Sequence, residues 1–404
     1  MSKKIPLVLS IMLSIILTIL AILITFQVTY MSLTGKYSQK LNDVMISQNI
    51  YSKLAEIENY YENLYIGELD EEKVTDNVMR GYIYGTGDKH GTYLNSDQLK
   101  EYMSDVGGTG VGIGVMVTYD SDRAALEIIT VMPDSPSLAA GLEVGDYITA
   151  VDGVSVYDTG YYGAVANVKG EAGTPVKLDV YRIVNGEYTE LEFEIKRANI
   201  TYISVMSHMN EDGTTGIVKI LSFDLNTPEQ FITAVEDLIS QGAERFVFDV
   251  RNNSGGELRS IHAILDYLVP EGPTIRIIDK EGNEETMTSD ARQLDMPMVV
   301  LINSRTASAA ELFAAALRDY QKADLIGVTT YGKGTMQTVI PLADNTALVI
   351  SYRMYAPPFS DNYDGVGITP DLEIELSESA AEQNSYKIAD ADDNQLIAAI
   401  NSLK

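Results

Sequence analysis

The chain has 404 residues, enough for two or three domains with hydrophobic cores of their own. Its 58 acidic residues outnumber 29 basic ones, and this net charge of -29 excludes a nucleic-acid partner, because phosphate binding requires clustered lysine and arginine. The absence of cysteine excludes disulfides, thiolate nucleophiles and cysteine-ligated metals.

The first segment of the chain has the composition of a membrane anchor. Residues 5–28 form an uncharged run long enough to cross a bilayer, and Lys3 and Lys4 precede it. A cleaved signal peptide would have a shorter apolar core that ends at small residues, whereas this run gives way to the residues Thr-Tyr-Met. We therefore expect an uncleaved, single-pass transmembrane helix at residues 1–29, with the rest of the chain on the outer side of the cell membrane.

Residues 30–104 are predicted to be a helical region, and a second helical segment is predicted at the C-terminal tail, residues 381–404. Apolar side chains at three- and four-residue spacing lay a stripe along one side of the first region: Tyr51, Leu54, Ile57, Tyr61, Leu64 and Tyr65. The stripe serves either to pack against a neighbouring element or to form a homodimer. The sequence leaves these two uses open.

Residues 105–196 are predicted to form a small β-rich domain with short helices. Closely spaced glycines end the helical pattern, and the alternating stretches VGIGVMVTYD and ALEIITVM indicate strands. The following stretch, SPSLAAGLEVGDYITAVDGVSV, adds a short helix, two turns and further strands. The stretch GVGIGV is not a dinucleotide fingerprint, since Val115 stands where the third glycine is due.

Residues 197–380 follow a strand, loop, helix rhythm, which predicts a mainly parallel sheet. The apolar strands are expected at 245–250, 296–303 and 323–328, and the helices at 257–269 and 309–320. The loops NNSGG and SRTAS follow the first two strands. Ligands of such sheets gather at the carboxyl ends of the strands, so these loops are predicted to border the functional site.

The stretch GVTTYGKGTMQ comes after the third strand and almost matches a phosphate-binding loop. Such a loop needs Ser or Thr directly after its lysine and a helix next. Here Gly334 follows Lys333, and TMQTVIPLADNTALVISYRMY predicts two paired strands around a turn. A nucleotide site is therefore rejected, and Lys333 needs another role.

Ser308 opens the helix after the second strand, and two roles fit this place. With Glu311 it matches a capping box, in which the serine hydroxyl satisfies a free helical amide. As a nucleophile it would have the amide of Ala309 beside it to stabilise an oxyanion, and Gly255 or Gly256 of the loop NNSGG would supply a second donor.

A nucleophilic serine needs a base, and the chain has only three histidines. His90 lies in a turn-like stretch, His208 in an expected hairpin connection, and His262 on a helix where it is predicted to be structural or exposed. A Ser-His-Asp arrangement with Asp249 stays open. A Ser-Lys pair is the alternative.

Lys333 would act as a base only if its pKa falls from about 10.4 to about pH 7 to 8, which requires burial or a nearby cation. The flanking Gly332 and Gly334 allow the chain to fold the lysine inward. Gln337 could then hold the amine through its neutral amide oxygen. This pairing requires a sharp turn at the glycines, because a straight strand would separate the two side chains by about 13 Å.

Four stretches resemble the signature blocks of the C-terminal processing peptidases, or tail-specific serine proteases: DVRNNSGGEL, NSRTASAAELFAAAL, GVTTYGKGTMQ and GVGITPD. The resemblance implies an α/β multidomain protein whose peptidase core, residues 197–380, has a crotonase-like and Clp-like fold. It further implies a serine endopeptidase with Ser308 as nucleophile, Lys333 as general base and Gln337 as the residue that positions the lysine. Ser254 departs from the pattern, since many members have proline there.

In that resemblance the oxyanion hole is formed by the amides of Ala309 and of a glycine in NNSGG, and no metal or other cofactor is expected. The segment 105–196 is similar to a PDZ domain, and GVGIGV resembles its carboxylate-binding loop: Val111, Gly112, Ile113, Gly114 and Val115. Such domains bind peptides with free C-termini. Two rival functions are a non-catalytic PDZ scaffold on a protease-like fold and a crotonase-like acyltransferase.

Overall fold

The computed structural model describes residues 49–184, 187–381, 383 and 387–403, in two compact units divided between Val78 and Met79. In the first unit, residues 49–64 are helical, and α2 (Glu71–Thr86) begins there. The predicted apolar stripe on this helix is largely exposed, as at Tyr51 and Leu64.

The predicted fold class needs a correction at the N-terminus, where it included a transmembrane helix. In the part of the chain that the structure describes, no helix is both long and apolar enough to span a bilayer. The 16-residue α2, for example, begins with two glutamates, whereas a span needs about 20 predominantly apolar residues. The predicted anchor, residues 1–29, lies outside the described residues. The described chain is a mixed α/β fold without a transmembrane helix.

The helical region is also interrupted by a strand. β1 (Thr92–Leu94) lies between α2 and α3 (Ser96–Val106) and pairs antiparallel with β18 (Ala347–Ala356). Three residues are too few to show an alternating pattern, so the sequence gives no signal of this strand. It joins the segment before the PDZ-like part to the second half of the chain.

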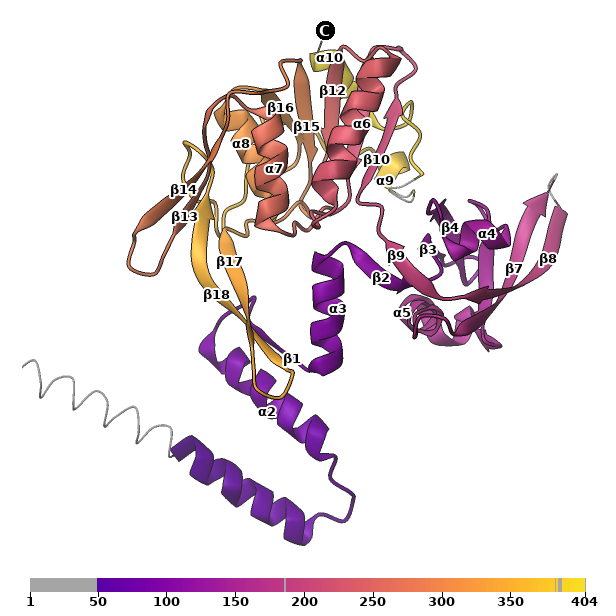
Figure 1. Cartoon of the computed structure of the whole chain (residues 1–404), viewed down its shortest axis with the longest axis vertical. Helices are drawn as coiled ribbons and strands as arrows, with labels where there is room; N and C mark the ends of the chain where they lie inside the picture. Colours follow the sequence, from indigo (N-terminus) through magenta and orange to yellow (C-terminus); the bar gives the residue numbers. More distant parts are fainter. Residues whose placement is uncertain (1–48, 185–186, 382, 384–386, 404) are drawn as a thin grey trace, which may run out of the picture. The chain divides into compact units, whose positions relative to one another are not determined.

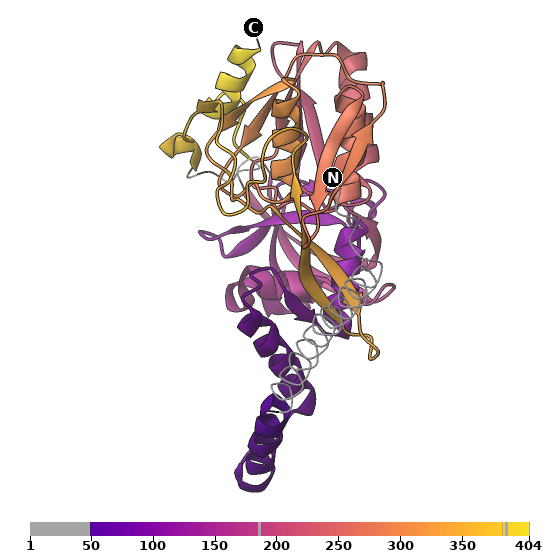
Figure 2. The ribbon, with the colours of Figure 1, turned by 90° about the vertical axis from the view of Figure 1, so that its left-hand side faces the viewer.

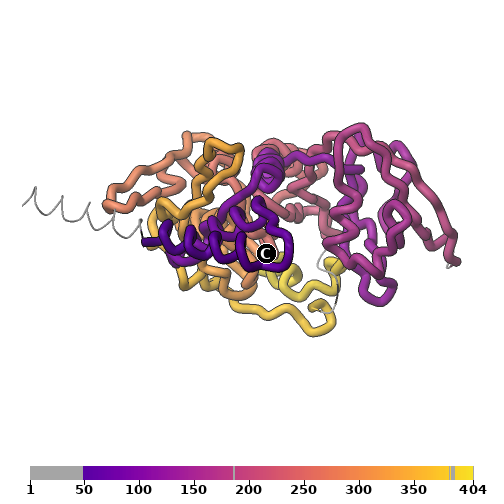
Figure 3. The backbone as a smooth tube through the Cα atoms, turned by 90° about the horizontal axis from the view of Figure 1, so that it is seen from below, coloured from indigo at the N-terminus to yellow at the C-terminus, as the bar shows by residue number. Residues whose placement is uncertain are grey.

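The PDZ-like segment forms its own core, in which Leu126, Ile148 and Leu178 are fully buried. Its two ends lie side by side, because β2 (Thr109–Gly112) pairs with β9 (Ala198–Thr201) (Figure 1). In Figure 3 the segment is the purple and magenta part of the tube at the right. The elements between them are β3 (Val115–Asp120), β4 (Ala125–Val131), α4 (Pro136–Ala140), β5 (Tyr147–Val151), β6 (Val154–Ser155), α5 (Val156–Val168), β7 (Pro175–Val184) and β8 (Glu187–Lys196).

The second half of the chain is built on a six-stranded sheet in the order β10-β11-β12-β15-β16-β19. The edge strand β10 pairs antiparallel, and the other pairings are parallel, as predicted. The strands are β10 (Val205–Met209), β11 (Thr215–Ile220), β12 (Arg245–Asp249), β15 (Met298–Ile302), β16 (Ala323–Gly327) and β19 (Leu372–Glu373). The three predicted apolar strands correspond to β12, β15 and β16.

Helices cover both faces of this sheet (Figures 1 and 2). α6 (Thr227–Gln241), α7 (Leu258–Leu268) and α8 (Ala309–Asp319) enclose the larger core on one face. α10 (Asn394–Ser402) packs on the other through Leu396 and Ala399. The first nine residues of α8 are all buried, which explains why its sequence is apolar on nearly every side.

A second sheet has the order β1-β18-β13-β14, with β17 (Thr335–Pro341) also paired to β18. Its other strands are β13 (Gly272–Ile278) and β14 (Glu284–Ser289), and the short α9 (Glu378–Ala381) follows later in the chain. The register of the β17–β18 hairpin shifts between Met336 and Gln337, and this shift places Gln337 opposite Ser351. The hairpin carries the predicted lysine loop at its start.

Candidate active site

The predicted site residues from three loops line one pocket of about 330 Å³. The loop after β12 supplies two glycines, the loop after β15 and the start of α8 supply the serine and its neighbour, and the segment entering β17 supplies the lysine and the glutamine: Gly255, Gly256, Ser308, Ala309, Lys333 and Gln337. The structure thus brings all six residues to one place at the carboxyl edge of the sheet.

Ser308 stands at the N-terminal end of α8. Its backbone φ is 56°, in the left-handed region that residues other than glycine rarely adopt. The residue is buried, and its hydroxyl oxygen lies 2.9 Å from the hydroxyl of Tyr355. The Tyr355 hydroxyl also lies 2.8 Å from the carbonyl oxygen of Lys333. Tyr355 comes from β18, and no motif in the sequence marks it as a site residue.

Glu311 is fully buried one turn into α8 and links the serine to the lysine loop. Its carboxylate accepts hydrogen bonds from the N–H of Ser308 at 2.7 Å, of Gly332 at 2.6 Å and of Lys333 at 2.9 Å. The hydroxyl of Thr330 donates to it at 2.5 Å. The capping interaction predicted for Glu311 therefore also fixes the backbone around Lys333.

Lys333 is half-buried, and this burial holds its pKa below the ordinary value, although the charges of Glu311 and Asp88 act to raise it. Gly332 makes the turn before it with a φ of 87°, and a Cβ there would lie 2.7 Å from the N–H nitrogen of Gly367. Only glycine fits this turn. The chain bends sharply at this glycine, and Lys333 and Gln337 line the same pocket.

The backbone amides near Ser308 differ in their hydrogen bonding. The N–H of Gly255 donates to the side-chain oxygen of Asn253 at 2.8 Å. Among the described residues, neither Gly256 nor Ala309 has an acceptor for its N–H. Of the two glycines that the sequence offered as oxyanion donors, Gly256 is the one whose amide is available.

The three histidines do not contact Ser308. His262 hydrogen-bonds Thr274 at 2.9 Å, and His208 lies on the edge strand β10, 2.9 Å from Asp390. His90 lies in the turn before β1, as expected, and its N–H donates to the carboxylate of Asp88 at 3.0 Å. Burial and the charge of Lys333 lower the pKa of His90. The turn that carries it was not recognised as part of the site from the sequence.

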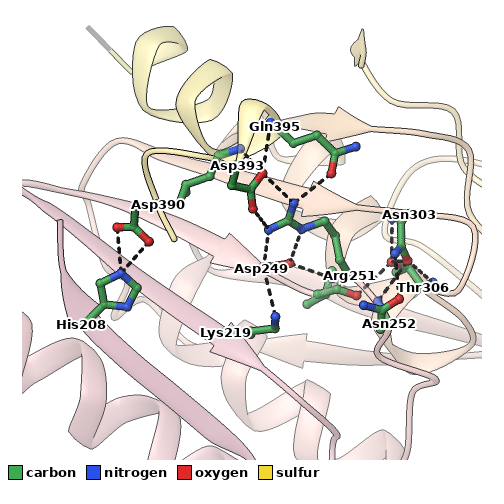
Figure 4. Close-up of polar contacts among 12 residues, drawn as sticks. His208, Lys219, Asp249, Arg251, Asn252, Asn303, Thr306, Asp390, Asp393 and Gln395 are labelled. Carbon is green, nitrogen blue, oxygen red and sulfur yellow. Dashed lines mark hydrogen bonds and ion pairs between the residues drawn. The ribbon is translucent and has the colours of Figure 1, made fainter. Parts of the chain in front are cut away.

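Asp249, the open candidate for a Ser-His-Asp arrangement, belongs to a buried ionic cluster (Figure 4). Its carboxylate accepts from the Arg251 guanidinium at 2.8 Å, and Lys219 lies 3.9 Å away. Arg251 also binds Asp393, just before α10, at 2.7 Å. The cluster ties the C-terminal helix to the sheet and leaves Asp249 without a histidine partner.

The predicted carboxylate-binding loop borders a second pocket, of about 110 Å³, in the PDZ-like segment. All five of its predicted residues line the pocket: Val111, Gly112, Ile113, Gly114 and Val115. Apolar side chains from β3, β4, β5 and α5 also line it: Val117, Leu126, Ile148, Val165 and Val168. Lys169 and Tyr202 add polar groups to the lining. Such a pocket suits an apolar side chain.

The comparisons with known proteins match two parts of the chain to known families. Residues 214–374 match peptidase family S41, and residues 127–182 match the PDZ domain. The carboxy-terminal-processing protease of Bartonella bacilliformis is 30% identical over 81% of this chain and 76% of its own length. The chain belongs to peptidase family S41. It is a serine peptidase with a PDZ domain, as the resemblance implied.

Two further proteins are similar to this chain. The carboxy-terminal processing protease CtpA of Bacillus subtilis is 30% identical over 86% of this chain and 75% of its own length. A solved structure of an S41 protein from Bacteroides fragilis, 18% identical, covers 84% of this chain and 98% of its own, with a TM-score of 0.51. This structure supports the S41 fold.

Proposed function

We propose that this S41 peptidase hydrolyses peptide bonds of unstructured substrates through a Ser308–Lys333 pair, with Gln337 holding the lysine. The observation that carries the proposal is the pocket that both residues line, because burial within it lowers the pKa of the Lys333 amine. A lysine must be neutral to accept a proton, and burial favours that form.

In the first half of the reaction, the neutral amine of Lys333 takes the hydroxyl proton as Ser308 Oγ attacks the scissile carbonyl carbon. The C–O bond forms, and the carbonyl oxygen becomes an oxyanion that the free amides of Ala309 and Gly256 stabilise. The Lys333 ammonium then gives its proton to the leaving amine as the C–N bond breaks.

In the second half, water attacks the acyl-enzyme, and Lys333 again serves as the base. The proton returns to Ser308 as the ester bond breaks, so the resting enzyme is regenerated. The amide of Gly255 takes no part in this scheme, because it already donates to Asn253.

The PDZ domain is proposed to bind the substrate's free C-terminus. The amides of the Val111–Val115 loop would receive the carboxylate, and the adjoining apolar pocket would take the last side chain. Movement of the PDZ domain over the active site is the regulation that the family resemblance implies.

The test is cleavage of an unstructured peptide with a free apolar C-terminus by the full-length chain and by its Ser308→Ala and Lys333→Ala variants. Both variants are expected to be inactive, since each removes one member of a unit. Equal cleavage by all three chains would reject the proposal. Loss of activity in both variants would also exclude a non-catalytic PDZ scaffold.

Location and oligomeric state stay predictions from the sequence. The outward-facing location depends on residues 5–28, which lie outside the described chain, and cell fractionation with protease accessibility tests it. A homodimer through the exposed stripe on residues 51–65 is tested by the molecular mass of the chain in solution.

A further inference from the structure

A carboxylate from the turn between α2 and β1 reaches the hairpin that carries the site. Asp88 accepts two hydrogen bonds from Ser351 of β18, one from its N–H at 2.9 Å and one from its hydroxyl at 2.8 Å. The N–H of His90 donates to the same carboxylate at 3.0 Å. Asp88 is thus held by its own turn while it binds a residue 263 positions further along the chain.

Ser351 connects Asp88 to Gln337. The two residues are paired across the β17–β18 hairpin, and the Gln337 side-chain nitrogen lies 3.1 Å from the Ser351 hydroxyl oxygen. A second contact of that nitrogen, 3.3 Å long, is to the carbonyl oxygen of Thr335. No described residue donates to the Gln337 side-chain oxygen.

The direction of each hydrogen bond between Asp88, Ser351 and Gln337 follows from which groups can donate a hydrogen and which can only accept one. A carboxylate only accepts, so the Ser351 hydroxyl must give its single hydrogen to Asp88. The oxygen of Ser351 can then only accept, and it accepts from the Gln337 nitrogen. The amide oxygen of Gln337 is consequently left as an acceptor for another group.

We propose that Asp88 is a positioning residue, which acts through Ser351 to hold the Gln337 amide with its oxygen available to the Lys333 amine. This inference rests on the proposed function of Lys333 as the base. It makes the turn after α2, which precedes the PDZ domain in the chain, a part of the catalytic arrangement. Asp88 itself does not touch the substrate.

The charged and titratable groups around Lys333 come from several elements. Asp88 and Glu311 act to raise the pKa of the lysine, and His90 lies close enough to respond to the lysine's charge. Asp364, which accepts from the N–H of Gly334 at 2.9 Å, also acts on His90. Removing the charge of Asp88 should therefore move the acid limb of the pH profile to lower pH.

The decisive substitution is Asp88→Asn, which keeps the shape of the side chain. Its amide can donate to Ser351, which frees the serine hydroxyl to donate to Gln337 and so to rotate the glutamine amide. We expect kcat to fall roughly ten- to a hundredfold, the cost of one hydrogen bond to a charged group, with KM for a peptide unchanged. Ser351→Ala should also lower kcat without a change in KM.

The matched control is Asp97→Asn in α3, which removes an equal charge from a side chain that is 91% exposed. It should leave kcat, KM and the pH profile unchanged. Thermal midpoints of all variants report whether they fold. If Asp88→Asn fails to fold, Ser351→Ala decides the question, because it removes only one hydroxyl.

The outcomes separate this inference from the proposed function. If Ser308→Ala and Lys333→Ala are inactive while Asp88→Asn and Ser351→Ala keep the wild-type kcat, the role of Asp88 is rejected and the Ser-Lys site stands. A uniform loss of activity at every pH, without a shift of the acid limb, would make Asp88 merely structural and also reject the inference. Activity in Ser308→Ala would reject the proposed function itself.

Discussion

The hydroxyl of Tyr355 lies 2.9 Å from Ser308 Oγ and at the same time 2.8 Å from the carbonyl oxygen of Lys333. The Tyr355 hydroxyl is the donor in both contacts and shares its one hydrogen between them, so it links the serine to the backbone of the lysine loop. Ser308 Oγ is the acceptor in the first of these contacts.

Tyr355→Phe should lower both stability and kcat. The variant removes the hydrogen bond to the partly buried carbonyl of Lys333, which costs about 1–3 kcal/mol. It also frees the lysine loop and the serine side chain, so kcat should fall by about tenfold while KM is unchanged. Chemical denaturation and steady-state peptide cleavage measure the two effects.

Tyr320→Phe is the matched control for this substitution. The hydroxyl of Tyr320 also donates to a backbone carbonyl, that of Pro273 at 2.8 Å, but this residue does not line the catalytic pocket. It should lose stability and keep its kcat. Wild-type stability and kcat in Tyr355→Phe would show that its two hydrogen bonds are unimportant.

The pH profile of kcat/KM should have an acid limb at a pH below the ordinary lysine pKa of about 10.4, because burial lowers the pKa of Lys333. A protonated amine cannot take the serine proton, so activity should be lost as the pH falls through this pKa and should be present above it. Lys333→Arg should be inactive at every pH, since arginine stays protonated. An active arginine variant would contradict a lysine base.

Val165→Glu should weaken peptide binding to the PDZ domain. The side chain of Val165 lines the apolar pocket beside the Val111–Val115 loop, and a carboxylate there would repel the substrate's own carboxylate. We expect affinity to fall by about tenfold or more, measured by fluorescence anisotropy with a labelled peptide and the Ser308→Ala chain. Tyr162→Glu, on the same helix but 86% exposed and outside the pocket, should bind normally. Equal affinities would place the peptide elsewhere.

Asp249→Asn should destabilise the fold by about 3–5 kcal/mol at pH 7, because it leaves Arg251 buried with one ionic partner fewer. Burial acts to raise the pKa of Asp249, but Arg251 and Lys219 outweigh it and hold the pKa below its usual value. The contribution of Asp249 to the free energy of unfolding is thus present above about pH 3.9, the pKa of an aspartate in the unfolded chain. It is lost as the pH falls through the lower pKa of Asp249 in the folded state. The variant should therefore lose less stability than the wild type in acid.

Denaturation at several pH values tests the role of Asp249. The control is Asp290→Asn, since Asp290 also pairs with an arginine two residues later but lies on the surface. Its substitution should change stability little. Similar effects at both positions would show that burial does not strengthen the Asp249 pair.

The elements that could be predicted best from the sequence are those in which one pattern of apolar residues extends over the whole strand or helix. β12, β15 and α8 follow from apolar runs of the right length, because strands and helices buried on all sides need no polar face. The hairpin β17–β18 follows from its turn and its β-branched residues. β1 escaped prediction because it is short and its partner strand lies far along the chain.

The candidate site could be predicted from the sequence in part. Ser308, Lys333 and Gln337 stand in recognisable sequence blocks, and the structure brings them to one pocket. Tyr355 and Asp88 stand in no such block. They reach the site through the pairing of β18 with β17 and β1, and a single sequence does not specify which distant strands pair.

The Ser-Lys mechanism requires that the Lys333 amine is neutral at a pH at which an ordinary lysine is charged. The most direct measurement is an NMR titration of the full-length Ser308→Ala chain after reductive methylation of its lysines with ¹³C-formaldehyde, beside the same chain carrying Lys333→Ala. We predict one methyl resonance that titrates clearly below the others and is missing from the Lys333→Ala chain. If every lysine resonance titrates near pH 10.4, the account of a lysine base is wrong.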